Sequence, residues 1–223
     1  MVAVGHRYGR GPWVLDRLDA ELAFGTVVAV SGANGTGKST VLRILAGVQR
    51  PRRGVVHGRP ARVAYVPERL EPPVVRVGRW FAELARLRGS VPDSVAWQLA
   101  ALGTTVPDDA LLSSLSKGTV RKVLLADALA APAPLLVLDE PWADLDAAGA
   151  AALSGALRRR AADGALVVVA DHTGAGRALA DAAIGLGAVS SGADSEAHYR
   201  GVADRVAELD EAATRLGFRR VGP

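Results

Sequence analysis

The glycine-rich segment Gly32–Ser39 constrains the fold of this chain more than any other part of its sequence. Its residues follow the spacing G-x-x-x-x-G-K-[ST]. The apolar run Thr26–Ser31 before it predicts a buried strand, and Ser39–Ala46 after it has the apolar spacing of a helix. In such a unit, backbone N–H groups converge on phosphate oxygens and the helix N-terminus adds partial positive charge. The sequence therefore predicts a phosphate-binding loop within an α/β fold.

The side chains of this loop suit a nucleoside triphosphate with magnesium. Lys38 is expected to reach the β- and γ-phosphates, and the Ser39 hydroxyl is expected to ligate Mg²⁺. A chance Gly-Lys-Ser turn is the alternative, and the flanking strand and helix argue against it. The residues predicted to bind the nucleotide in this region are Gly32, Asn34, Gly35, Thr36, Gly37, Lys38, Ser39 and Thr40.

Strand and helix patterns alternate along the rest of the chain. Leu135–Leu138 and Ala165–Ala170 are short apolar runs that predict buried strands, while Val120–Ala131 and Ala147–Ala161 have helical spacing. This alternation predicts a mostly parallel sheet flanked by helices, the architecture of a P-loop NTPase.

The remaining segments predict two smaller parts within a single domain that spans residues 1–223. Short β segments at 55–57 and 62–66, joined by turns, predict a small antiparallel β portion. Helical spacing beyond Pro73, with a second short helix at Ala96–Leu102, predicts a helical subdomain at about 70–130, inserted in the α/β core. The apolar face of Val202, Val206, Leu209, Ala213 and Leu216 predicts a closing helix.

Composition narrows the class of protein. The chain has 223 residues, 49% of them hydrophobic, which indicates a soluble globular domain. No apolar run reaches the roughly 18 residues of a membrane span, and the start lacks the pattern of a secretory signal. The absence of cysteine excludes disulfides and thiolate metal sites. A net charge of +4, dispersed along the chain, gives no reason to expect nucleic acid as a partner.

Lysine is rare in this sequence, so each lysine is informative. Lys38, Lys117 and Lys122 are the three present, and every other Lys/Arg position is arginine. Lys38 belongs to the predicted phosphate loop. The sequence gives no role for Lys122.

Two adjacent carboxylates follow the apolar strand at 135–138. Because ligands in open α/β sheets bind at the carboxyl ends of the strands, Asp139 and Glu140 are expected beside the phosphate loop. Asp139 would hold Mg²⁺, and Glu140 would accept a proton from the water that attacks the γ-phosphate. Without the loop, such a pair is more typical of a helix cap.

Three further stretches, in this order, resemble the ATP-binding cassette (ABC) family. Leu115–Thr119 lies about twenty residues before the acidic strand end, at the place of the family's LSGGQ signature. Glu140–Asp146 resembles the Walker B glutamate followed by the D-loop, and His172 matches the switch histidine. The resemblance covers about residues 8–187.

In the family, two cassettes face each other head to tail and enclose each ATP between them. The resemblance therefore implies that Ser116, Lys117 and Gly118 contact ATP held by a second subunit. It also implies D-loop roles for Asp144 and Asp146.

Other roles implied by the resemblance concern single residues. His172 would contact the γ-phosphate, and Tyr8 would stack on adenine, with Trp13 as a competitor for that role. Glu68 stands where the family usually has glutamine; it can still ligate Mg²⁺, or be a solvated acidic turn residue. In the signature, Lys117 and Thr119 are departures that resemble those of some exporter cassettes.

The resemblance implies an ATP-hydrolysing subunit of an ABC transporter. The variant signature at Leu115–Thr119 favours an exporter. Its cofactors would be ATP and Mg²⁺. Its partners would be a second ABC ATPase subunit and integral membrane transporter subunits, at the cytoplasmic face of the membrane, contacted through the helical insert around residues 77–87. The alternative is a non-transport ABC ATPase acting on a ribosome, DNA or an assembly complex. A small-molecule kinase would leave Leu115–Thr119 and His172 unexplained.

Overall fold

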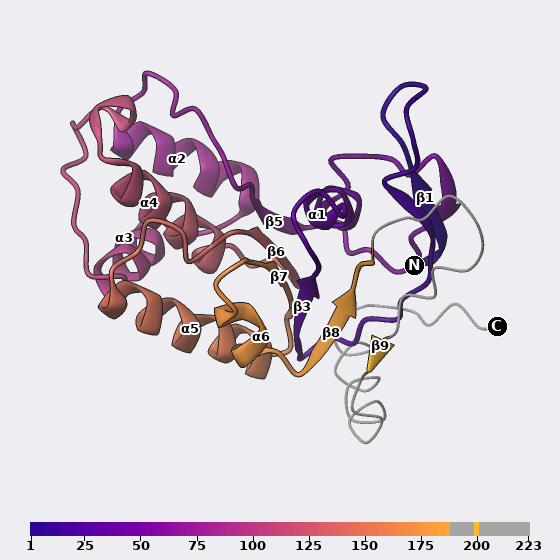
Figure 1. Cartoon of the computed structure of the whole chain (residues 1–223). Helices are drawn as coiled ribbons and strands as arrows, with labels where there is room; N and C mark the ends of the chain where they lie inside the picture. The colour runs from indigo at the N-terminus through magenta and orange to yellow at the C-terminus, as the bar shows by residue number, and fades with distance from the viewer. Residues whose placement is uncertain (188–198, 201–223) are drawn as a thin grey trace.

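The computed structural model describes residues 1–187 and 199–200, and a twisted, mostly parallel sheet forms its centre (Figure 1). The strand order is β5-β6-β7-β3-β8-β9, with the first five strands parallel and β9 antiparallel to β8. The strands are β3 (Val27–Ser31), β5 (Val63–Val66), β6 (Leu135–Asp139), β7 (Leu166–Ala170), β8 (Ala182–Gly185) and β9 (Tyr199–Arg200). The predicted α/β fold with a mostly parallel sheet is confirmed.

The central strands are apolar throughout because both faces of the sheet are covered. Along β3, Val28 and Val30 face the core formed with helix α1 (Lys38–Ala46), whereas Val27 and Ala29 face a second core. Helices α4 (Lys117–Ala130) and α5 (Ala147–Ala162) close that second core. Alternate side chains of a strand point to opposite faces, so a strand with apolar residues at every position fits only a sheet covered on both sides.

A three-stranded antiparallel sheet, the second part of the predicted fold, stands beside α1 (Figure 1). Its order is β2-β1-β4, formed by β1 (Val2–His6), β2 (Leu15–Leu18) and β4 (Arg53–Val55). The connection between β1 and β2 carries Tyr8. This small sheet therefore sets the position of that ring.

Helices occupy the opposite side of the molecule in Figure 1. Helix α2 (Val77–Arg88) and helix α3 (Pro92–Ala101) pack with α4 through an apolar inner face that includes Val77, Phe81, Val95 and Leu99. A short 3₁₀ turn, η1 (Leu112–Ser114), leads into α4. Among the described residues, no helix has the length and apolar character needed to cross a membrane.

Two predicted boundaries were wrong by a few residues. Helix α4 begins at Lys117 rather than Val120, because the Ser116 side chain caps it by accepting a hydrogen bond from the Thr119 amide. Helix α3 begins at Pro92 rather than Ala96, since proline is tolerated in the first turn of a helix.

Other elements were displaced or not predicted at all. The short strand expected at 55–57 is β4 at Arg53–Val55, where pairing with β1 fixes its position. The segment at 62–66 does not join it in the antiparallel sheet: it is β5, which pairs in parallel with β6 at the edge of the central sheet. Strands β1, β2, β8 and β9, the turn η1 and the short helix α6 (Ala175–Leu179) were not predicted. The closing helix predicted around Val202–Leu216 lies outside the described residues.

Gly54 provides a test of the antiparallel sheet that holds Tyr8. Both Gly54 and Gly58 have positive φ, but a Cβ atom at Gly54 would overlap the backbone of Val2 and Ala3, whereas one at Gly58 has open space around it. We expect Gly58→Ala to cost about 1–2 kcal/mol of unfolding free energy and Gly54→Ala to cost a further ~1–3 kcal/mol. Denaturant unfolding of both variants measures the difference. Equal losses would contradict the β1–β4 pairing.

Candidate nucleotide site

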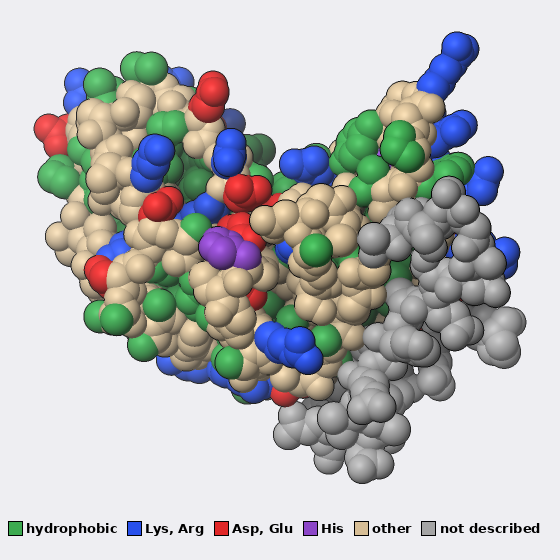
Figure 2. Space-filling view, viewed as in Figure 1, with side chains coloured by type: hydrophobic (Ala, Val, Ile, Leu, Met, Phe, Trp, Pro, Cys, Tyr) green, Lys and Arg blue, Asp and Glu red, His purple; other side chains and the backbone are tan. Residues whose placement is uncertain are grey.

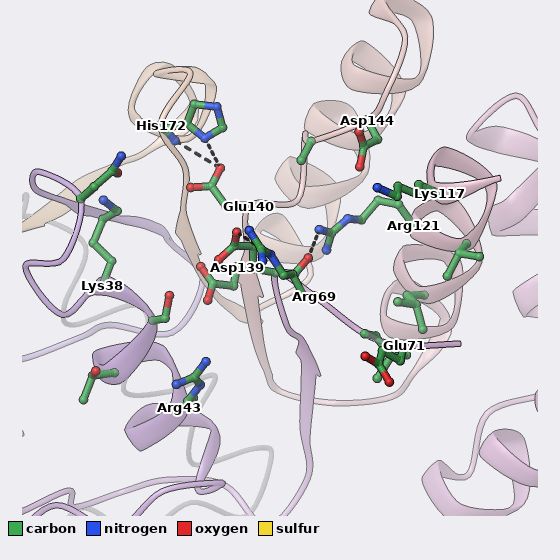
Figure 3. A pocket seen from close by; sticks show the side chains of 18 of the residues that line it. Lys38, Arg43, Arg69, Glu71, Lys117, Arg121, Asp139, Glu140, Asp144 and His172 are labelled. Atoms are coloured by element: carbon green, nitrogen blue, oxygen red, sulfur yellow. Dashed lines mark hydrogen bonds and ion pairs between the residues drawn. The ribbon is translucent and has the colours of Figure 1, made fainter. Parts of the chain in front are cut away.

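A cleft of about 1330 Å³ opens at the carboxyl edge of the parallel sheet. One wall is formed by the loop and helix at 34–43, the opposite wall by residues of α4, and the floor by Asp139 and Glu140 (Figure 3). In the space-filling view the cleft lies below the notch between the two raised parts of the molecule, where acidic side chains gather beside a histidine (Figure 2). The phosphate loop, the acidic end of β6 and the signature segment, which are separate motifs in the sequence, thus line one cleft.

Close packing fixes the shape of the phosphate loop. A Cβ atom at Gly32 would lie 2.6 Å from the Thr36 hydroxyl and 2.7 Å from the Leu186 carbonyl oxygen, so only glycine fits there. Gly37, with φ of 100°, precedes α1 and allows its N-terminus to face the cleft. The Lys38 ammonium donates to the carbonyl oxygens of Gly32, at 2.8 Å, and Ala33, at 3.1 Å. The loop is therefore shaped as an anion cradle by its own packing.

Asp139 ends β6 with a buried carboxylate, and only 3% of the residue is exposed. Burial raises its pKa; the Ser39 hydrogen bond opposes the shift, and the neighbouring carboxylates Glu68 and Glu140 add to it. Its Oδ2 atom finds no hydrogen-bond partner among the described residues. A buried carboxylate oxygen without a partner, next to a serine hydroxyl, is a donor set that fits a divalent cation.

Glu140 and His172 are in direct contact. The Glu140 Oε2 atom lies 2.6 Å from His172 Nδ1, and the His172 backbone N–H donates to the same oxygen at 3.3 Å. Because an ionised carboxylate can only accept, Nδ1 carries the proton, and Nε2 is directed away from the carboxylate. Glu140 also has φ of 51°, a costly backbone conformation for a residue other than glycine. The turn after β6 thus aims this carboxylate at the histidine.

The residues predicted around the adenine and the metal also reach the cleft. Tyr8 is 49% exposed at the rim, with its hydroxyl 3.1 Å from the Thr40 hydroxyl. Trp13, the alternative ring for stacking on adenine, instead makes cation–π contacts. The guanidinium groups of Arg7 and Arg53 lie 5.0 and 4.2 Å from its ring centre. Of the two rings, Tyr8 is the one at the cleft.

Glu68 lies on the loop after β5 and lines the cleft. Its carboxylate is half-exposed and lies 3.5 Å from Arg69 Nε. An exposed pair of this kind holds the carboxylate weakly. Glu68 is therefore near Asp139 and able to turn toward the centre of the cleft.

The signature residues open helix α4, and the D-loop packs against them. Ser116 caps the helix, and Lys117 reaches into the cleft wall. A Cβ atom at Gly118 would lie 2.7 Å from the Asp144 carbonyl oxygen, so the D-loop backbone approaches as closely as a glycine permits. The structure therefore places the signature and Asp144 side by side.

Asp146 and Lys122 form the next contact along these two segments. The Asp146 side chain caps α5 by accepting from the Gly149 amide at 2.6 Å, and it lies 3.2 Å from the buried Lys122 ammonium. The Gly149 hydrogen bond and Lys122 lower the pKa of Asp146. Lys122, whose role no sequence pattern indicated, ties α4 to the start of α5.

Three arginines that line the cleft were not predicted: Arg43, Arg121 and Arg69, which is paired with Glu68. Arg43 lies one helical turn after Ser39 on α1, and its guanidinium is 3.5 Å from the Tyr8 hydroxyl. Its spacing of four residues from Ser39 was the available signal. Arg121 extends from α4 toward the Glu68 loop (Figure 3). Its partner is far away in sequence, so no local pattern marked it.

Comparisons with known proteins agree with this geometry. A family model described as ABC transporter matches residues 15–143, from β2 to the D-loop. The zinc import ATP-binding protein ZnuC of Cereibacter sphaeroides is 36% identical over 179 residues, which cover 77% of this chain and 72% of that protein. The cytochrome c biogenesis ATP-binding export protein CcmA of Cupriavidus necator is 35% identical over 188 residues, covering 77% and 82%.

A solved structure shares the fold at lower sequence identity. The ATP-binding cassette MJ0796, solved as a dimer in a post-hydrolysis state with ADP and phosphate, superimposes with a TM-score of 0.71 at 21% identity. The match covers 90% of this chain and 96% of that one. It extends the agreement in fold beyond the residues matched by the family model.

Asp139→Asn is expected to stabilise the protein and to impair its function. The substitution removes a buried charge that Glu68 and Glu140 repel, so the melting temperature should rise by roughly 2–4 °C for each kcal/mol gained. ATP hydrolysis should fall about 100-fold or more, because asparagine would be a poorer donor to the divalent cation that this site fits. Calorimetry and an ATPase assay measure both effects, with the exposed Glu83→Gln as the control. A lowered melting temperature with full activity would contradict the site.

Proposed function

The chain belongs to the ABC transporter family as an ATP-binding, ATP-hydrolysing domain, and we propose that it is the ATPase subunit of a membrane transporter, working as a dimer with separate transmembrane subunits. The observation that carries this proposal is the single cleft in which the phosphate loop, two strand-end carboxylates and a histidine meet. A nucleoside triphosphate laid on the loop has its γ-phosphate directed toward Glu140 and His172.

Each side chain of the cleft has a role in this proposal. Lys38 and the backbone amides of the loop would bind the phosphates, and Tyr8 would cover the adenine. Ser39 and Asp139 would hold Mg²⁺, with Glu68 as a further ligand; the ion, when bound, neutralises charge on the phosphate oxygens. Glu140 would take a proton from the attacking water, and His172 would steady that carboxylate and contact the γ-phosphate through Nε2.

The signature residues would serve a second subunit. Ser116, Lys117 and Gly118 present a hydroxyl, an ammonium and the N-terminus of a 14-residue helix, a combination suited to phosphate. The MJ0796 cassette, which shares this fold, was solved as a dimer, and this supports the pairing of two cassettes here. Asp144, whose carbonyl touches Gly118, would lie at the same interface.

Glu140→Gln tests the role of the proposed base. Glutamine keeps the shape of the side chain but cannot accept the proton, so turnover should fall by roughly 10²- to 10⁴-fold while ATP still binds. We expect an ATP-dependent dimer to accumulate, measured by light scattering after gel filtration. Lys38→Ala is the companion variant and should lose ATP binding. Unchanged hydrolysis in Glu140→Gln would refute the assignment of the base.

Exposed apolar side chains on the helical side of the molecule support a membrane partner. Val74 is 81% exposed, Leu87 75% and Trp97 61%, all on or next to α2 and α3. Apolar residues exposed on neighbouring elements mark a protein contact more often than isolated ones do. We propose that transmembrane subunits cover this region and hold the chain at the cytoplasmic face of the membrane.

Co-purification tests the membrane partner. The tagged chain, extracted from membranes of its host in mild detergent, should bring down an integral membrane protein, and the pair Val74→Ser and Leu87→Ser should reduce the yield several-fold. Val48→Ser is the matched control, since Val48 is 66% exposed at the end of α1. Recovery only with ribosomes or nucleic acid would favour the alternative, a non-transport ABC ATPase.

We propose export as the direction of transport. The variant signature Leu115–Thr119 and the likeness to an export protein support it, whereas the likeness to a zinc import protein supports the opposite direction. Vesicles containing the recovered membrane protein decide between them. With ATP supplied on the face that carries this chain, an exporter moves its substrate away from that face and an importer moves it toward that face.

A further inference from the structure

Arg121 joins two parts of the site that are distant in sequence. Its side chain leaves α4 five residues after Ser116 and is almost fully buried, with 7% of the residue exposed. Nη1 donates to the Pro67 carbonyl oxygen at 2.8 Å, and Nη2 donates to the Glu68 carbonyl oxygen. We propose that Arg121 is a positioning residue that locks the Glu68 loop to the signature helix, so that the two move as one unit when nucleotide binds.

The loop held by Arg121 starts directly at the sheet edge. Strand β5 ends at Val66 and pairs in parallel with β6, with Val66 beside Leu138. Pro67 and Glu68 therefore emerge next to the carboxylates at the end of β6. A shift of the backbone at Pro67 and Glu68 toward a bound nucleotide displaces the carbonyl groups that Arg121 holds.

Carboxylates surround the buried guanidinium. Burial lowers the pKa of Arg121, and the charges of Asp144, Asp139, Glu68 and Glu140 oppose that shift. An arginine remains protonated in such surroundings. The cation is thus held between the loop and the acidic floor of the cleft, and removing it would leave these carboxylates to repel one another.

The far end of the connection is the part of α4 that faces a second subunit. Gly118 touches the Asp144 carbonyl, and Lys122 is paired with Asp146, so the first turns of α4 are fixed to the D-loop. A single helical turn separates Arg121 from Gly118, so both belong to one continuously hydrogen-bonded stretch of α4. Signature and D-loop would therefore follow the Glu68 loop.

This inference rests on the proposed ATP-dependent dimer, so its test separates ATP binding from dimer formation. Arg121→Gln and Arg121→Lys are each placed in the Glu140→Gln background, with Arg86→Gln as the control. Arg86 is an exposed arginine of α2 that is paired with Glu83. The Arg86→Gln substitution therefore removes the same charge as Arg121→Gln but leaves the Glu68 loop unchanged. ATP affinity is measured by calorimetry with Mg²⁺ present, and dimer affinity by analytical ultracentrifugation at saturating ATP.

We expect Arg121→Gln to retain ATP affinity within about 2-fold while dimer affinity falls by ~10-fold or more, the equivalent of about 1.4 kcal/mol. In the chain with Glu140 intact, kcat should fall with KM nearly unchanged. Arg121→Lys should remain impaired, because a lysine keeps the charge but lacks the planar fork that bridges two carbonyl groups.

Wild-type dimer affinity in Arg121→Gln, or ATP affinity reduced in the same proportion, would overturn the inference. Full recovery in Arg121→Lys would also overturn it, since charge alone would then suffice. If Arg121→Gln does not fold, the same two measurements on Arg121→Lys decide. Failure of the Glu140→Gln parent to dimerise with ATP is a separate result that counts against the proposed function.

Discussion

The parallel pairing of β6, β7 and β3 is the constraint on which the site depends. Asp139 pairs with Ala170, and Ala170 with Val30, so three consecutive strands end at one level of the sheet. The residues that follow are the carboxylate Glu140, the segment leading to His172 and the phosphate loop. The Glu140 amide, bonded to the Ala170 carbonyl at 2.8 Å, continues the ladder one residue into the turn. Chemistry spread over 140 residues of sequence thus meets at one edge.

The same strand arrangement buries a carboxylate at the end of β6, where an ionised group destabilises the folded protein. A sheet apolar on both faces delivers Asp139 into a buried position, and its raised pKa records the cost of ionisation there. The cleft around it is lined by four more carboxylates and by five cations: Glu68, Glu71, Glu140 and Asp144, and Lys38, Arg43, Arg69, Lys117 and Arg121. Such a balance is typical of a site that completes its charge with bound ligand. At the end of β6, the buried carboxylate of Asp139 therefore lowers the stability of the fold while serving the proposed function of the site.

The sequence predicted those parts of the site that depend on neighbours along the chain. The phosphate loop, Asp139, Glu140 and His172 each follow an apolar strand, and local pattern finds such strands. Strand β8, Ala182–Gly185, is short and made of small residues, and its identity depends on pairing with β3. Arg121 was missed because its acceptors lie more than fifty residues earlier. The partner of Lys122 is Asp146, at the start of α5, and this pairing can be identified only from the packing of α4 against α5.

The central claim is that one ATP is enclosed by the phosphate loop of one chain and the signature of another. A crystal or cryo-EM structure of the Glu140→Gln variant with ATP and Mg²⁺ tests it most directly. The account predicts two copies related head to tail, with each γ-phosphate between Lys38 of one copy and Ser116 and Gly118 of the other. ATP bound within a single copy, with its phosphates away from Lys38 and no signature residue of a second copy nearby, would contradict it.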